Sequence, residues 1–132
     1  MSERMPKVYV VNQPMIRGGG RAIDVRPAAA FGEVVSVFPP GQPPLDGDHV
    51  TRVLNERLAD FRAHDFLVLV GHTMLIAAAG AVAARLTGGV VQVLVWDNRD
   101  HLYVPVRLRL WDDAFDRPRG GGPVEQRSGE LT

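Results

Sequence analysis

The chain has 132 residues, which is enough for one domain with a single hydrophobic core. Its formal net charge is zero, so no overall field attracts it to nucleic acid or to a membrane surface. It contains no cysteine, which excludes disulfides and thiolate metal sites. The N-terminus lacks the apolar run of a signal peptide, and we expect a cytoplasmic protein.

Two strands and a short helix are predicted in the first part of the chain. The apolar segments at 7–11 and 33–38 are typical of strands. Between them, residues 27–31 predict a short helix that Asp24 caps and Gly32 ends.

An amphipathic helix follows a stiff, proline-rich connection at 39–44. Asp46 or Asp48 supplies its N-terminal cap. Its apolar positions recur at helical spacing and fall on one face: Val50, Val53, Leu54, Leu58 and Phe61.

The most informative segment is a buried strand that turns sharply into an apolar helix. The apolar run at 66–70 favours a strand covered on both faces, as in a parallel sheet. Gly71 makes the turn, residues 74–86 favour helix, and His72 or Thr73 becomes the N-cap. The free backbone N–H groups of a first helical turn attract anions, although every strand-to-helix turn has such groups.

The same segment has no charged residue from 66 to 84, a length close to the ~20 residues of a membrane-spanning helix. A polar turn lies near its middle, so we favour instead a soluble helix that is buried on most of its circumference. Sheet covers one side of this helix, and we expect another copy of the chain to cover the other, giving a homodimer through the alanine-rich helix. Its small residues allow close approach: Ala77, Gly80, Ala81 and Ala84.

An antiparallel hairpin is predicted at 90–96 and 102–110, because only a short polar loop separates these apolar strands. Pro105 removes one ladder donor and indicates an edge strand. Arg107 and Arg109 are interpreted as protection of that edge, with a strip that contacts a partner or a phosphate as the alternative. The apolar residues of the strand share the opposite face: Leu102, Val104, Val106, Leu108 and Leu110.

The hydrophobic pattern fails from 112 onward. We therefore expect a single α/β domain at 1–111 and a flexible tail at 112–132. Acidic residues in the tail dilute the attraction of its arginines to nucleic acid, so nucleic-acid binding is not expected.

This order of elements predicts an α/β fold: a single three-layer, Rossmann-like or flavodoxin-like domain, mostly parallel, with an antiparallel C-terminal edge hairpin. Ligands of such sheets bind beyond the carboxyl ends of the strands. Those ends, together with the glycine loop at 18–20, supply the candidate ligand-binding residues: Asn12, Gln13, Arg17, Gly71, His72, Thr73 and Asp97.

Standard catalytic and cofactor motifs are missing from the sequence. The histidines show no pair at the spacing of a helical metal site, and no nucleotide-binding fingerprint follows a strand, so neither a metal nor a cofactor is expected. A general acid/base pair of His72 and Asp97 stays open for a small hydrolase-type enzyme, with Thr73 or Asn12 orienting the substrate.

Four segments, at 8–12, 31–32, 66–71 and 93–97, form a set with the Tyr-x-Pro-like strand that follows them. This set resembles small uncharacterised α/β proteins encoded by phages and mobile elements. Those proteins often have an Asp-Pro type pair where this chain has His72 and Thr73. The resemblance implies an accessory or host-interaction role rather than one in central metabolism.

Two main functions are compatible with these patterns. One is a ligand-binding module that holds or sequesters an anionic or nucleotide-derived small molecule at the Gly71 turn, with the Arg17 loop closing over it. The other is a protein-interaction or assembly module that acts as a homo-oligomer through the alanine-rich helix or the edge strand. Enzymatic turnover is a third alternative.

Overall fold

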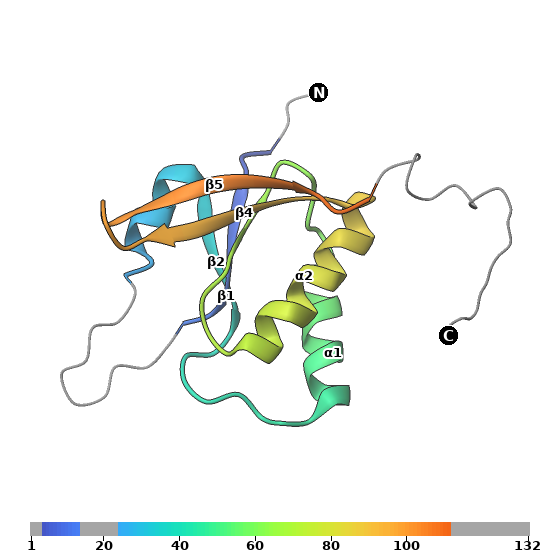
Figure 1. The fold of residues 1–132 in the computed structure, drawn as a ribbon. Helices are drawn as coiled ribbons and strands as arrows, with labels where there is room; N and C mark the ends of the chain where they lie inside the picture. The colour runs from blue at the N-terminus through green and yellow to red at the C-terminus, as the bar shows by residue number, and fades with distance from the viewer. Residues whose placement is uncertain (1–3, 14–23, 112–132) are drawn as a thin grey trace, which may run out of the picture.

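The computed structural model describes residues 4–13 and 24–111, which contain the strands and helices of Figure 1. The strands are β1 (Lys7–Asn12), β2 (Glu33–Phe38), β3 (Phe66–Val68), β4 (Val90–Asp97) and β5 (Leu102–Arg109). The helices are the 3-10 helix η1 (Arg26–Phe31) and the α-helices α1 (Gly47–Arg57) and α2 (Thr73–Thr87). The predicted glycine loop at 18–20 and the predicted tail at 112–132 lie outside the described residues.

The five strands form one sheet in the order β2-β1-β3-β4-β5. Strands β2, β1, β3 and β4 run parallel, and β5 pairs antiparallel with β4. The structure thus confirms an α/β domain with a mostly parallel sheet and an antiparallel hairpin at one edge.

The helices are divided between the two faces of the sheet. On one face α1 and α2 pack against alternate strand residues, among them Tyr9, Leu67 and Val93. On the other face η1 packs near Val8 and Val68. Right-handed crossovers explain this division. From β1 the chain moves to β2 in one direction along the sheet, whereas from β2 to β3 and from β3 to β4 it moves in the other direction. The three-layer Rossmann-like arrangement is not confirmed, since only η1 lies on the second face among the described residues.

Local sequence accounts for most helix ends. The Asp46 carboxylate accepts hydrogen bonds from the backbone N–H groups of Asp48 (3.1 Å) and His49 (3.3 Å), so Asp46 is the cap of α1. Helix α2 ends at Gly88, whose left-handed conformation (φ 71°) suits glycine. Asp24 acts at the start of η1, as expected: its carboxylate accepts a hydrogen bond from the backbone N–H of Arg26 (3.0 Å), although Val25 is the N-cap residue and makes no side-chain cap. Residues 26–31 form a 3-10 helix rather than an α-helix.

Helix α2 is less enclosed than its composition predicts. It buries Leu75, Ala79, Ala83 and Ala84 against the sheet and α1, while Ala77 and Ala81 stay exposed. Ala84, which we expected at a contact between two copies, instead lies in the core of the single chain at 3% exposure. Among the described residues, no helix is long and apolar enough to cross a membrane.

Candidate functional site

The carboxyl ends of β1 and β3 lie side by side at the centre of the sheet. The chain leaves β1 toward β2 on one side and leaves β3 toward β4 on the other, so this is the point where the strand order reverses. Open α/β sheets bind ligands in the crevice at such a point. Two predicted site residues, Asn12 and Gly71, meet here.

Asn12 is 2% exposed, and both polar atoms of its side chain are hydrogen-bonded. Its Nδ2 donates to the carbonyl oxygens of Pro39 (3.0 Å) and Gly41 (3.2 Å), and its Oδ1 accepts from the backbone N–H of His72 (3.1 Å). These partners belong to the β2–α1 loop and to the β3–α2 turn. Asn12 therefore ties the ends of β1, β2 and β3 together, and its hydrogen-bonding groups are already occupied.

Position 71 requires glycine, because the backbone after β3 passes very close to Asn12 at the end of β1. Its φ of 112° lies in a region that other residues rarely adopt, and a Cβ there would overlap the carbonyl oxygen and Cβ of Asn12. The sequence prediction that Gly71 makes the turn is borne out, with the added reason that the two strand ends touch.

His72 caps α2, as expected. Its Nδ1 accepts from the backbone N–H of Met74 (3.1 Å), and its carbonyl accepts from Ile76 N–H (3.0 Å). Thr73 follows as the first residue of the helix and is exposed. His72 thus uses one ring nitrogen for the cap, and Thr73 is exposed at the helix N-terminus.

In the part of the chain that the structure describes, no side-chain hydrogen bond joins Gln13 or Asp97 to the group formed by Asn12, Gly71 and His72. Gln13 is exposed and joins it only through its backbone carbonyl, which accepts from Gly41 N–H (3.2 Å). Arg17 lies outside the described residues. The Asp97 carboxylate accepts from the backbone N–H groups of Arg99 (2.9 Å) and Asp100 (3.4 Å) and so stabilises the β4–β5 turn.

The proposed acid/base pair has little geometric support. The cap bond of His72 and the turn bonds of Asp97 engage each side chain separately, and no hydrogen bond or ion pair joins the two within the described ranges. Groups of three or more His, Asp or Glu side chains that could hold a metal ion are also not found in 4–13 and 24–111.

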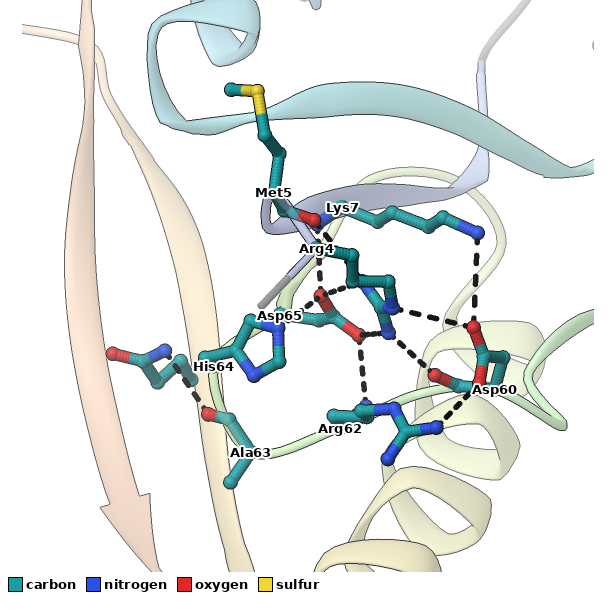
Figure 2. A network of polar contacts seen from close by, with 9 residues as sticks. Arg4, Met5, Lys7, Asp60, Arg62, Ala63, His64 and Asp65 are labelled. Carbon is teal, nitrogen blue, oxygen red and sulfur yellow. Dashed lines mark hydrogen bonds and ion pairs between the residues drawn. The ribbon is translucent and has the colours of Figure 1, made fainter. Parts of the chain in front are cut away.

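A buried carboxylate at the opposite end of the sheet was missed by the sequence analysis (Figure 2). Asp65 has no exposed surface and accepts two hydrogen bonds from the guanidinium of Arg4, at 2.8 and 2.7 Å. It also accepts from the backbone N–H groups of Lys7 (2.8 Å) and Arg62 (2.8 Å). Asp60 lies on the outside of the cluster, within ion-pair distance of Arg4, Lys7 and Arg62.

This cluster stabilises the fold. Burial raises the pKa of Asp65, but the hydrogen bonds from Arg4, Lys7 and Arg62 outweigh burial and bring the pKa below its ordinary value of 3.8. All four hydrogen bonds of the Asp65 carboxylate are made within the chain, so Asp65 links the segment before β1 to the loop before β3.

The second surface of interest is an exposed apolar stripe on β5. The sequence grouped its β5 residues on one face, but it did not show whether that face is covered. Val106 lies opposite Val93 and Leu108 opposite Val91, so these β5 side chains point to the same side of the sheet as α1 and α2. However, β5 packs mainly against β4 and η1, and α2 reaches only as far as β4 (Figure 1). We define the β5 face as six side chains that are 36–51% exposed: Val95, Leu102, Val104, Val106, Leu108 and Leu110.

The opposite side of β5 carries Tyr103, Pro105, Arg107 and Arg109, and of these four residues Tyr103 alone is buried. Tyr103 is 3% exposed, its hydroxyl donates to the carbonyl of Asp24 (3.2 Å), and its ring meets Trp96 edge-on at 5.0 Å. Burial raises the pKa of Tyr103 to about 12. Alternation alone could not have shown this, because it groups residues by face without saying which face is covered.

Comparison with known families supplies one match, which covers residues 6–110, to a family described as Phage Pam3 gp32-like protein. The chain belongs to this family. No curated protein and no solved structure matches it. The family confirms the resemblance to small phage proteins, and its matched region contains Asn12, Asp65, Gly71 and the whole of the β5 face.

Proposed function

We propose that this phage-family protein has an accessory role as a protein-interaction module, and that the β5 face is its binding surface. The supporting observation is the exposure of six large apolar side chains on neighbouring strands. Apolar patches of this kind on soluble proteins are often binding sites, because their exposure to water costs free energy that a partner recovers.

The hydrogen bonds around Asn12, Gly71 and His72 favour this function over ligand binding. Both polar atoms of the buried Asn12 side chain already have partners in the chain, and one ring nitrogen of His72 is used by the helix cap. The β5 face, in contrast, has apolar surface that neither α-helix covers in the described part of the chain.

Site-specific photo-crosslinking in phage-producing cells tests this proposal. A benzophenone amino acid would replace Val106 in one variant and Val34 in the control. The control suits the purpose because Val34 is 40% exposed on β2, at the other edge of the sheet, whereas Val106 is 37% exposed.

We expect a defined adduct from position 106, no matching adduct from position 34, and loss of the adduct when Leu108→Glu is added. Equal labelling at both positions, or an adduct that survives Leu108→Glu, would contradict the proposal.

A second candidate is the ligand-binding module at Gly71, His72 and Thr73, for an anionic or nucleotide-derived molecule. It is favoured by one observation, the N-terminus of α2 with the exposed Thr73 at the point where the strand order reverses. Native mass spectrometry of gently purified protein tests it. A retained small anion that is lost in Thr73→Ala and Arg17→Ala, with oligomeric state unchanged, is the expected result. An unchanged affinity in both variants counts against the site.

A further inference from the structure

The open edge of β5 is unsuited to adding another strand. Leu110 N–H donates to the Gly89 carbonyl (2.7 Å), which places the backbone groups of even-numbered β5 residues toward β4. Odd-numbered residues therefore direct their N–H and C=O groups to the outer edge. Pro105 lies in the middle of that edge and has no N–H, so an added strand would lose a ladder hydrogen bond there.

The partner must consequently pack on the β5 face rather than pair with the β5 edge. The face is a row of Leu and Val side chains at two-residue spacing, with Val95 of β4 directly opposite Val104. Such a surface is typical of one half of a sheet-on-sheet packing, in which side chains of two inner faces interdigitate.

The size of the face fits one half of a homodimer contact. With 36–51% of each residue exposed, the six side chains present on the order of 400 Å² of apolar surface, within the range of about 300–600 Å² for the largest patch on a monomer. A stable interface buries about 800 Å² per partner, and about 65% of a homodimer interface is apolar, which makes roughly 500 Å². The face therefore supplies most of the apolar area that one partner contributes.

Charge does not oppose self-association. The formal net charge is zero, so two copies do not repel each other overall. The side chains of Arg107 and Arg109 belong to the opposite side of the sheet, because they alternate with the apolar residues and pair with Gln92 and Val90. Two apolar faces can thus meet without burying these cations.

We propose that the partner of the β5 face is a second copy of this chain, packed face to face about a two-fold axis near Val106. This inference rests on the proposed function and names the partner. An axis across the strands runs the two copies of β5 antiparallel, so that Val106 meets Val106 and Val104 lies near Leu108 of the other copy. It replaces the alanine-rich surface of α2 as the expected dimer contact.

Sedimentation equilibrium of the full chain tests the proposal. We expect the wild type to be a dimer at micromolar concentration and Val106→Glu to weaken association by at least about 100-fold, because two carboxylates would meet at the axis. Val34→Glu is the matched control and should leave the dimer intact, since its exposure is 40% against 37% for Val106. Ala81→Glu, on the exposed side of α2, should also leave it intact.

A cross-link gives an independent readout that does not depend on loss of association. The chain has no cysteine, so Val106→Cys introduces a single thiol near the expected axis. Sheets packed face to face lie about 10 Å apart, which is too far for a disulfide, so a short bismaleimide is the suitable reagent. It should link two copies of Val106→Cys at low protein concentration, and it should not link Val34→Cys.

A monomeric wild type, a dimer unaffected by Val106→Glu, or a dimer dissociated by Ala81→Glu alone would each overturn the inference. If the wild type is monomeric and position 106 still gives an adduct with a different protein, the homodimer is refuted and the proposed protein-interaction function is retained.

Discussion

Removing the buried charge of Asp65 is the sharpest test of how this fold is held together. Its carboxylate accepts four hydrogen bonds, two from Arg4 and one each from the backbone N–H groups of Lys7 and Arg62. In Asp65→Asn an amide nitrogen replaces one of the two oxygens. If it takes the place of Oδ2, it faces the donors of Arg4 and Arg62 and both bonds are lost.

The expected loss can be worked out from these bonds. A hydrogen bond to a charged group contributes about 1.5–3 kcal/mol to stability. Removing one partner of a buried ion pair costs about 3–5 kcal/mol. The side chain of Arg4 is 27% exposed, so water can solvate part of its charge after the substitution. We therefore expect a loss of about 3 kcal/mol in the free energy of unfolding, out of the roughly 5–15 kcal/mol typical of a domain.

Urea unfolding followed by tryptophan fluorescence measures this loss. Asp60→Asn is the matched control, because its side chain is 52% exposed and its ion pairs with Arg4, Lys7 and Arg62 lie at the surface. Exposed pairs contribute about 0–1 kcal/mol, so the control should stay within that range. If Asp65→Asn lost no more stability than Asp60→Asn, the assigned role of Asp65 would be refuted.

The pH dependence supplies a second readout of the same group. The folded-state pKa of Asp65 lies below its ordinary value of 3.8, so its contribution is present above pH 3.8 and is lost as pH falls through the folded pKa. The difference in stability between wild type and Asp65→Asn should accordingly be largest near neutral pH and shrink in acid. A difference that grows in acid would contradict this sign.

Two further predictions concern packing and titration. Gly71→Ala should lower the free energy of unfolding by at least about 2 kcal/mol, because its Cβ would overlap Asn12 at a φ of 112°, whereas Gly80→Ala, with open space at its Cβ, should raise it by about 0.5–1 kcal/mol. Equal effects of the two substitutions in urea unfolding would argue against the close contact. Burial raises the pKa of Tyr103 to about 12, so the ultraviolet absorbance of its tyrosinate should be missing at pH 10 and appear only near pH 12. The contribution of Tyr103 to the free energy of unfolding is present below pH 10, where an unfolded tyrosine stays protonated, and is lost as pH rises toward 12. The difference in stability between wild type and Tyr103→Phe measures this contribution.

Much of the local structure follows from the sequence alone. The run at 66–70, the turn at Gly71 and the helix after it were predicted in the correct order, and the strand at 33–38 has its predicted bounds. Strand β3 itself is shorter than expected and ends at Val68. Such predictions succeed because hydrophobic period and capping chemistry act over a few neighbouring residues.

The candidate site was predictable only in part. Neighbouring parallel strands bring their carboxyl ends together, and this correctly placed Asn12 beside Gly71. The amide of Asn12 was expected to serve a ligand, but it bonds to Pro39, Gly41 and His72. Those carbonyl and amide partners carry no side-chain signal in the sequence, so the use of Asn12 as a tie between loops could not be read from residue types.

The sequence by itself determined which segments are strands and helices, how β5 alternates, and where α2 begins and ends. Tertiary structure decided the rest: that Asp65 meets Arg4 across 61 positions of chain, and that Tyr103 is buried while Val106 is exposed. The physical reason is that alternation divides a strand into two faces, whereas coverage depends on how far a helix from another part of the chain extends over the sheet. Helix α2 reaches β4 and leaves β5 open, and this open face is where we place the function of the protein.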